Sequence, residues 1–578
     1  MHDDRPVPPD DDPLAAVTRV IAGFGVGGRA LREVVARLTE RAYRFDELIR
    51  DSGLSRRTVE DLLGALGPDL IRRPGGEPEL TIAPERRAAY RDLCRYEHLA
   101  RTRIADPLAE RMAAASELVG RMGELVAAAP VSRKALDHVA ATPETAVRRA
   151  VWLDGVFELA GRRLLCVGDH DLTSLAVCQV NPAVAVTVVD IDERILEFID
   201  VRADRLGLDV RCLHADLRFG LPAGAAEQAD LVVTDPPYTP EGVRLFLARG
   251  LAGLRDRENA RLVMAYGFGE RHPALGLKVQ RAAQDLHLAC EAILPDFNRY
   301  VGAQAVGSSS DLYVFRPTAK SWSLIGPRAE GALAKNHTHG IYTHGPQSLE
   351  AAQEPLSGEP ADALIDAAAA GSTVTGLTAV AGPGWPDGHP RLSGVARLDV
   401  GALIGEGLPR GIASRPGAAV AADLSQDPGP WLLRALLAVN ATRLALLVPN
   451  NHPDVANAEG QRRLTEIIAP KYALRFRRSF PTPRHCVVEA TAVPPDPEDP
   501  GSLIAHALLS RAHGKLGNVW REALIRAART TRDVVLTKNQ ARTMIEKSAP
   551  GPGVLDLRLI ELPRHRIRHI LATSPRAF

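Results

Sequence analysis

The stretch LLCVGDHDLTSLAV, from Leu164 to Val177, decides the fold of the chain. An apolar run ends at a glycine and is followed by apolar residues at helical spacing, which is the pattern of a buried parallel strand, a tight turn and a helix. Nucleotide-binding turns of this kind usually carry three glycines, because the backbone must approach phosphate groups closely. Here Gly168 stands alone and is followed by Asp169, His170 and Asp171. The turn therefore predicts a ligand other than a pyrophosphate.

The alternation of strand and helix continues beyond this stretch. The strand-like runs are RLLCVGD at 163–169, VTVVDID at 186–192, VRCLHAD at 210–216, ADLVVTD at 229–235 and RLVMAYG at 261–267. Helical segments lie between most of them, so right-handed β-α-β units should build an open, doubly wound parallel sheet. The sequence therefore predicts an α/β fold with a Rossmann-like methyltransferase sheet over residues 137–317.

Four of these five runs end in aspartate: Asp169, Asp190, Asp216 and Asp235. Ligands of open α/β sheets bind at the carboxyl ends of the strands. We therefore expect the four acids to line one crevice. Turn capping explains any one of these aspartates, but it is a poor account of all four at equivalent positions.

The acids of this crevice favour a cationic nucleoside. Carboxylates repel a pyrophosphate but attract a sulfonium group, so we predict decarboxylated S-adenosylmethionine, or S-adenosylmethionine itself, as the cofactor. Asp190, or nearby Asp192, is placed to accept hydrogen bonds from ribose hydroxyls, and Asp216 from the adenine amino group. The residues predicted to bind the cofactor are Gly168, Asp169, Asp190, Asp192, Asp216 and Leu217.

The fourth run continues into TDPPYTPEG, residues 234–242. Consecutive prolines fix the backbone and carry no N–H, so the turn after Asp235 is stiff and holds Tyr238 over the crevice. Such a turn suits an amine nucleophile: Asp235 accepts the proton of the amine, and the ring of Tyr238 stacks on the molecule that carries the amine. We predict Asp235, His170, Asp171 and Tyr238 as catalytic residues. The residues predicted to bind substrate are Pro236, Pro237, Glu241, Asp296, Asn298 and Tyr300.

The rest of the chain divides by composition and periodicity, and 578 residues predict about three or four domains. The predicted regions are a disordered tail at 1–14, a winged helix-turn-helix at 15–90, a helical connector at 91–136, the sheet domain at 137–317, a linker at 318–347, a degenerate α/β repeat at 348–493, and a linker with a basic helical tail at 494–578. The winged helix either contacts DNA through Arg56 and Arg57 or serves dimerisation or packing.

The repeat is inferred from two matching strand ends. Asp423 follows a strand as Asp235 does, and the run 446–448 ends the next strand as 262–264 does. The repeat has no counterpart of the GDHD turn or of the Asp-Pro-Pro turn. We expect it to pack on the first sheet or to cover its mouth.

Composition limits the partners. Lys+Arg at 71 and Asp+Glu at 70 give a net charge of +1, so no global field draws the chain to nucleic acid or to an anionic membrane. The six cysteines form no C-x-x-C pair, and the sequence shows no signal peptide and no run of 18 apolar residues. We therefore predict a cytoplasmic protein without a membrane partner. No metal is predicted, because His337, His339 and His344 lack clean ligand spacing.

Several blocks resemble, in order and spacing, the branched-chain polyamine synthases, the N4-bis(aminopropyl)spermidine synthase family. The blocks are DHVAATPETAVRRA at 137–150, GDHDLTSLAV, VVDIDERILEFI, ADLRFGLP, TDPPYTPEGVRLFLARGLAGL and FNRYVG at 297–302. The resemblance implies transfer of an aminopropyl group from decarboxylated S-adenosylmethionine to a polyamine nitrogen, with release of methylthioadenosine. The chain departs from the family at His170, where the family has an acid, and at Tyr238, where the family tends to have one.

Three functions follow from these observations. The first is an aminopropyl or related alkyl transferase acting on a small polyamine-like amine, favoured by Asp171, Glu241 and Asp296. The alternative is an S-adenosylmethionine-dependent amino-methyltransferase acting on a nucleic-acid or small-molecule amine, favoured by the aromatic ring of Tyr238 and by the basic residues Arg56 and Arg57. A second alternative is a non-catalytic regulator whose sheet senses a nucleoside metabolite and whose winged helix binds DNA. A homodimer is compatible with each.

Overall fold

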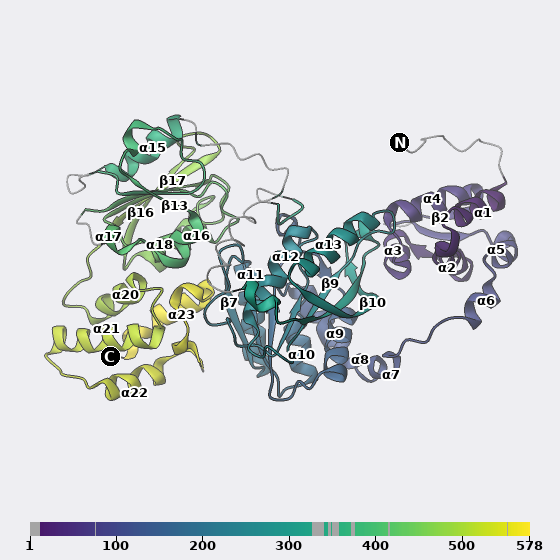
Figure 1. The fold of residues 1–578 in the computed structure, drawn as a ribbon, viewed down its shortest axis with the longest axis horizontal. Coiled ribbons are helices and arrows are strands. Elements are labelled where there is room, and N and C mark those ends of the chain that lie inside the picture. Colours follow the sequence, from purple (N-terminus) through teal and green to yellow (C-terminus); the bar gives the residue numbers. More distant parts are fainter. Residues whose placement is uncertain are drawn as a thin grey trace.

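The computed structural model shows an N-terminal helical unit, a central sheet domain and a C-terminal part with a second sheet (Figure 1). It describes residues 12–577 with the exception of 75–76, 326–339, 345–347, 349–355, 357, 371–375, 414–416 and 552. Of the tail expected at 1–14, residues 1–11 lie outside the described part. Helix α1 (Pro13–Gly23) already begins at Pro13, because the Asp12 carboxylate accepts the N–H of Leu14 and caps it.

The N-terminal unit contains a helix pair followed by a hairpin. Its elements after α1 are α2 (Gly28–Glu40), β1 (Tyr43–Arg44), α3 (Phe45–Ser52), α4 (Arg56–Leu66), β2 (Leu70–Arg73) and β3 (Glu79–Ile82). Gly53 ends α3 with φ 69°, and the Ser55 hydroxyl caps α4 by accepting the N–H of Thr58. These are the helices and hairpin expected here, while assignment to the winged-helix class stays a prediction. Within the described residues no single helix is long and apolar enough to cross a membrane, although α1 with Gly25–Glu40, a pair bent by 120°, meets that test.

The first turn of α4 lies against the central domain. The carboxylate of Glu270 accepts hydrogen bonds from the hydroxyls of Ser55 and Thr58, and Arg56 donates to Gln304 at 2.9 Å. A recognition helix presents this turn to the bases of DNA. The contacts therefore favour packing as the role of α4 and leave the predicted DNA contact without support.

The connector is helical, as expected, and is divided into short helices. Its helices are α5 (Arg87–Cys94), α6 (Tyr96–Arg101), α7 (Ala109–Ala114) and α8 (Ser116–Ala128). Arg95 adopts φ 53° and ends α5, and Pro107 lies in the break before α7. Both residues are incompatible with a continuous helix.

The central domain is an eight-stranded sheet with the order β4-β10-β11-β9-β8-β5-β6-β7. Its strands are β4 (Ala140–Ala141), β5 (Arg163–Val167), β6 (Ala185–Asp190), β7 (Val210–His214), β8 (Leu231–Thr234), β9 (Arg261–Tyr266), β10 (Leu288–Val301) and β11 (Ser309–Pro317). Its helices are α9 (Pro143–Val156), α10 (Thr173–Val180), α11 (Glu193–Leu206), α12 (Pro240–Gly253) and α13 (Pro273–Asp285). Strands β5 to β9 are parallel to one another, whereas β11 pairs antiparallel with β9. The Rossmann-like sheet predicted for this region is confirmed, and the β10–β11 hairpin is an addition to the prediction.

Both faces of this sheet are covered, which aligns the strand ends at one edge. Leu164 and Cys166 of β5 pack in one apolar cluster, and Leu165 and Val167 pack in another. Such a strand reads as a continuous apolar run in the sequence. The polar residues that follow each strand are therefore gathered along the carboxyl edge.

The C-terminal part contains a six-stranded sheet with the order β13-β12-β14-β15-β17-β16. Its strands are β12 (Ala379–Ala381), β13 (Ala396–Leu398), β14 (Ala419–Asp423), β15 (Arg443–Pro449), β16 (Tyr472–Arg478) and β17 (His485–Ala492), and its helices are α15 (Gly358–Ala369), α16 (Val400–Glu406), α17 (Arg410–Ala413), α18 (Trp431–Ala438) and α19 (Ala458–Ile468). In this order β14 and β15 occupy the places that β8 and β9 occupy in the central sheet, and β16 and β17 those of β10 and β11. The topology supports the interpretation of this region as a repeat that lacks a counterpart of β7.

The last region is a packed helical unit rather than a linker with a tail. Its helices are α20 (Pro500–Ser510), α21 (Leu516–Arg532), α22 (Lys538–Ser548) and α23 (Arg564–Thr573). Trp520 of α21 is fully buried, and Arg566 of α23 donates to Asp200 of α11. The apolar face of α21 packs against α20 and α22 within this unit, and α23 contacts α11 and α19 outside it.

Candidate active site

One cavity lies at the carboxyl ends of the parallel strands β5 to β8. The four aspartates that end strand-like runs, Asp169, Asp190, Asp216 and Asp235, all line it. His170, Asp171, Leu217, Pro236, Pro237, Tyr238 and Tyr300 line the same cavity. The structure therefore brings together most of the residues selected from the sequence, although their roles differ.

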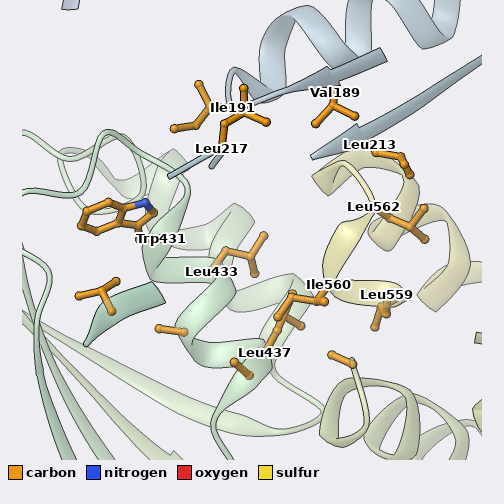
Figure 2. Close-up of a cluster of buried hydrophobic side chains, with 14 of the residues drawn as sticks. Val189, Ile191, Leu213, Leu217, Trp431, Leu433, Leu437, Leu559, Ile560 and Leu562 are labelled. Carbon is orange, nitrogen blue, oxygen red and sulfur yellow. The ribbon is translucent and has the colours of Figure 1, made fainter. Parts of the chain in front are cut away.

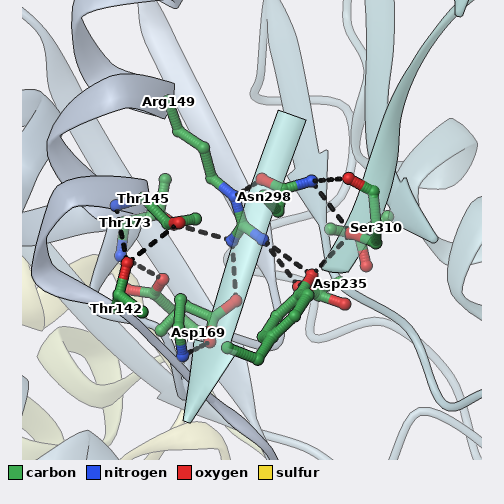
Figure 3. A network of polar contacts seen from close by, with 12 residues as sticks. Thr142, Thr145, Arg149, Asp169, Thr173, Asp235, Asn298 and Ser310 are labelled. Carbon is green, nitrogen blue, oxygen red and sulfur yellow. Dashed lines mark hydrogen bonds and ion pairs between the residues drawn. The ribbon is translucent and has the colours of Figure 1, made fainter. Parts of the chain in front are cut away.

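Arg149 of α9 is the centre of a buried polar network (Figure 3). Its guanidinium donates to Asp171 at 2.6 Å, to Asp235 at 2.7 Å and to the amide oxygen of Asn298 at 2.7 Å. The hydroxyl of Tyr300 also donates to Asp235, at 2.7 Å. Because Arg149 is 2 % exposed, its charge is compensated by these carboxylates rather than by water. One cation thus binds the acids of two different strand ends.

The two carboxylates on Arg149 have opposite pKa shifts. Burial and the charge of Asp171 raise the pKa of Asp235 to about 7. Burial acts in the same direction on Asp171, but the charge and hydrogen bond of Arg149, together with the N–H of Ala141, outweigh it and lower the pKa of Asp171. One acid therefore stays ionised while the other exchanges a proton near neutral pH, which is the property of a general base.

Asn298 acts on Arg149 rather than in the cavity. Its side-chain N–H donates to the hydroxyl of Ser310 at 2.9 Å, and Ser310 also lies 2.8 Å from the Tyr300 hydroxyl. Asn298 is fully buried between these residues. The unpredicted β10–β11 hairpin therefore fixes the guanidinium, and Asn298 positions Arg149 instead of contacting a substrate.

The GDHD turn is built on Gly168 and Asp169. Gly168 has φ 73°, a left-handed conformation that glycine adopts without strain. The carboxylate of Asp169 accepts the N–H groups of Thr173 at 2.8 Å and Ser174 at 3.1 Å. Burial raises the pKa of Asp169 to about 7. Asp169 thus caps α10 and presents little charge to a ligand.

His170 lies next to a second imidazole. Its ring stacks on His138 with centroids 4.5 Å apart, and its Nε2 lies 2.8 Å from the Ser132 hydroxyl. Burial and the neighbouring His138 lower the pKa of His170, and burial lowers that of His138 to about 4. Both rings are neutral at pH 7. The Nδ1 atom of His170 is buried and has no hydrogen-bond partner among the described residues.

Asp190 lines the cavity and has acceptor positions that the protein does not use. Its carboxylate accepts the N–H groups of Asp169 at 3.1 Å and Asp192 at 2.8 Å, and burial raises its pKa to about 6. Each oxygen retains a further acceptor position. Asp192 instead caps α11 and pairs with Arg194 at 2.6 Å. Of these two acids, Asp190 is the one that lines the cavity.

Asp216 is fully occupied by protein donors. Its carboxylate accepts the backbone N–H of Arg218 at 3.0 Å, the Nε of Arg218 at 2.8 Å and a terminal nitrogen of the same guanidinium. The indole N–H of Trp431, from the C-terminal part, donates to it at 2.9 Å. A carboxylate offers about four acceptor positions. No position is left for the adenine amino group, so the role predicted for Asp216 needs correction.

Tyr238 contributes an unpaired polar atom to the cavity. Its ring packs on Tyr266 with centroids 5.4 Å apart, and its hydroxyl is buried without a hydrogen-bond partner among the described residues. A buried hydroxyl normally has a partner. The hydroxyl of Tyr238 therefore fits a polar group of a ligand.

Two predicted substrate residues lie away from the cavity. Glu241 is in the first turn of α12. Asp296 lies on β10, where its side chain is 59 % exposed and accepts the hydroxyl of Ser309 at 3.0 Å. Two of the three acids that favoured a polyamine are thus absent from the lining. His337 and His339 lie outside the described residues, and within the described part no group of three or more His, Cys, Asp or Glu is placed to hold a metal ion.

Sequence reasoning missed Arg149 and Tyr342. Arg149 lies on α9 beside the buried Thr145 and Ala146, and an arginine on an apolar helix face was the available signal. Tyr342 belongs to a segment that was assigned to a linker. Ile341 and Tyr342 line the cavity, and the Thr239 hydroxyl donates to the carbonyl of Ile341 at 2.6 Å.

One family model matches the central domain. Residues 117–323 match the family model of the branched-chain polyamine synthase A C-terminal domain. This part of the chain is therefore similar to the branched-chain polyamine synthases. The match spans α8, the whole eight-stranded sheet and the residues of the Arg149 network. The prediction made from the sequence blocks is therefore confirmed for this domain.

The relatives cover part of the chain. The N4-bis(aminopropyl)spermidine synthase of Thermococcus kodakarensis is 32% identical over 190 residues, which is 32% of this chain and 53% of the relative. An uncharacterised protein of Methanocaldococcus jannaschii is 35% identical over 181 residues, 31% of this chain and 45% of the relative. The chain thus spans about half the length of the curated relatives that it matches.

A solved structure of a family member is also similar. It is the branched-chain polyamine synthase of Thermus thermophilus in complex with N4-aminopropylspermidine and 5'-methylthioadenosine. The sequence identity is 21% and the TM-score 0.38, with 52% of this chain and 92% of that chain covered.

Proposed function

We propose that the central domain transfers an aminopropyl group from decarboxylated S-adenosylmethionine to an amine nitrogen of a polyamine-like acceptor. The observation that carries the proposal is the pair Asp171 and Asp235 on the buried Arg149, at the carboxyl edge of the sheet. The match of the central domain to the polyamine synthase family model and the named relatives support the same reaction.

The residues of the cavity fit such a donor. Bound there, a sulfonium nucleoside supplies an electrophilic carbon. The turn at Gly168 lets the donor approach the backbone closely. Asp190 retains acceptor positions for the ribose hydroxyls. The hydroxyl of Tyr238, which has no hydrogen-bond partner among the described residues, can bind a polar group of the donor. The acids Asp171 and Asp235 repel a carboxylate on the donor, so the decarboxylated form is favoured.

Asp235 is the base of the proposed reaction. Arg149 and Tyr300 both bind its Oδ2, and the residue lines the cavity in which the acceptor nitrogen is proposed to bind. The nitrogen lone pair forms the new N–C bond, the C–S bond breaks with its electrons on sulfur, and the N–H proton passes to Asp235. A carboxylate with a pKa of about 7 is a far better base than an ordinary one.

The test is product analysis by mass spectrometry. The protein is incubated with decarboxylated S-adenosylmethionine and a panel of amines, beside the Asp235→Asn variant. We expect methylthioadenosine and an aminopropylated amine in equal amounts from the wild type, and at least about a hundredfold less from the variant. Absence of both products, or equal turnover by the variant, would contradict the proposal.

Methyl transfer from S-adenosylmethionine is the second candidate. The ring of Tyr238 in the cavity lining favours it, because aromatic rings next to Asp-Pro-Pro stack on planar amines. The same incubation with S-adenosylmethionine separates the two: a methylated amine in place of an aminopropylated one would establish the second candidate.

A further inference from the structure

The C-terminal part packs beside the nucleoside side of the cavity. Figure 2 shows an apolar cluster in which side chains at the ends of β6 and β7 face α18 and residues 559–562. The labelled side chains are Val189, Ile191, Leu213 and Leu217 from the central domain, and Trp431, Leu433, Leu437, Leu559, Ile560 and Leu562 from the C-terminal part. The interface is therefore continuous with the cavity at Leu217.

Polar contacts fix this interface. Arg434, which is 1 % exposed, donates to the ring of His214 at 3.0 Å, to Glu193 at 2.5 Å and to the carbonyl of Leu562 at 3.0 Å. A buried arginine with these partners cannot shift without losing charge-assisted hydrogen bonds. The position of α18 against β7 is accordingly well defined.

Trp431 is held in place by its own turn. The carboxylate of Asp427 accepts the N–H groups of Trp431 at 2.9 Å and Leu432 at 2.8 Å, and the ring of His452 lies 3.0 Å from the same carboxylate. Trp431 follows β14 as Tyr238 follows β8. Trp431 is the first residue of α18, and from there its indole reaches Asp216 of the central domain.

The indole N–H of Trp431 takes the last acceptor position of Asp216. Arg218 fills the other three, and its guanidinium lies 4.9 Å from the indole ring. A hydrogen bond to a charged acceptor contributes roughly ten- to a hundredfold to affinity. The base of a nucleoside donor in this cavity cannot donate such a hydrogen bond to Asp216, because Asp216 has no free lone pair.

We propose that Trp431 is a specificity-determining residue of the donor site, which makes the site insensitive to the exocyclic amino group of the base. The proposal rests on the proposed function, since it assumes a nucleoside donor in this cavity. The C-terminal repeat then has a defined role: it sets how the neighbouring domain recognises the donor.

The test compares two nucleosides by isothermal titration. 5'-Methylthioinosine carries an oxo group where 5'-methylthioadenosine carries the amino group. We expect the wild type to bind them within about threefold of each other, because neither group reaches a free acceptor. Trp431→Phe keeps an aromatic ring but frees one lone pair of Asp216, so this variant should prefer methylthioadenosine by about fivefold or more.

Trp385→Phe is the matched control. Trp385 is as buried as Trp431 and its indole N–H also donates to an oxygen, the carbonyl of Ala381 at 2.7 Å, but it lies within the C-terminal domain. Loss of structure alone lowers both affinities together and leaves their ratio unchanged. We therefore expect the ratio to change in Trp431→Phe and to remain at the wild-type value in Trp385→Phe.

The outcomes separate this inference from the proposed function. A wild type that prefers methylthioadenosine by more than about tenfold would overturn the role of Trp431 alone. An unchanged ratio in a Trp431→Phe protein that melts as a folded domain would do the same. If the wild type binds neither nucleoside, the proposed function fails and this inference with it.

Discussion

Replacing Arg149 by methionine tests whether this cation stabilises the two buried carboxylates of the site. The guanidinium donates to Asp171, Asp235 and Asn298 in a buried position. Methionine fills similar volume without charge. The substitution therefore leaves two carboxylates in a buried site without their shared cation.

The expected cost follows from the burial of the pair. Removing one partner of a buried ion pair costs about 3–5 kcal/mol. Losing the second ion pair, between Arg149 and Asp235, should add little, because the pKa of Asp235, already about 7, rises further without the cation and the carboxylate then takes up a proton. We expect the free energy of unfolding to fall by about 4 kcal/mol at pH 8. Since these acids gain protons as pH falls and then no longer need the cation, the loss should be smaller at pH 5.

Urea unfolding at pH 8 and pH 5 measures both quantities, with Arg148→Met as the control. Arg148 is the preceding residue of α9, but its partner Asp106 is 40 % exposed and the pair lies at the surface. Surface pairs contribute about 0–1 kcal/mol. The reasoning would be refuted if Arg149→Met cost no more than Arg148→Met, or if its cost did not depend on pH.

Three further predictions concern activity and stability. kcat/KM should rise with pH through an apparent pKa of about 7, because Asp235 must be ionised to accept the proton; a pH–rate profile that falls across this range contradicts that role. Gly168→Ala should lower the free energy of unfolding measured in urea by about 1 kcal/mol, since φ 73° strains alanine, and an unchanged stability would show that the turn does not need glycine. His170→Asp should raise turnover of linear polyamines relative to monoamines, because it adds an anionic contact beside Asp171; an unchanged ratio means that the loop serves another acceptor.

The strands of the central sheet were predictable because each is an apolar run that ends in polar residues. The hairpin of β10 and β11 was not, because most of β10 alternates between exposed and half-buried side chains and its pairing is interrupted between Leu294 and Asn298. The final helices were predicted, but their packing as one unit was not, for a related reason. Periodicity shows that a segment is helical but not where it packs.

The shared crevice of the four aspartates followed from topology, but the roles of individual acids did not. Arg149 binds residues that are 22, 86 and 149 positions away in the sequence. Trp431 reaches Asp216 across 215 positions. Only the fold brings such partners together, and they decide whether a carboxylate caps a helix, binds a cation or remains free for a ligand.

The most direct test of the central claim is calorimetric titration with decarboxylated S-adenosylmethionine and with S-adenosylmethionine under the same conditions. The account predicts at least about tenfold tighter binding of the decarboxylated form, because Asp171 and Asp235 disfavour a carboxylate on the donor. Tighter binding of S-adenosylmethionine would contradict aminopropyl transfer and make methyl transfer the function of this site.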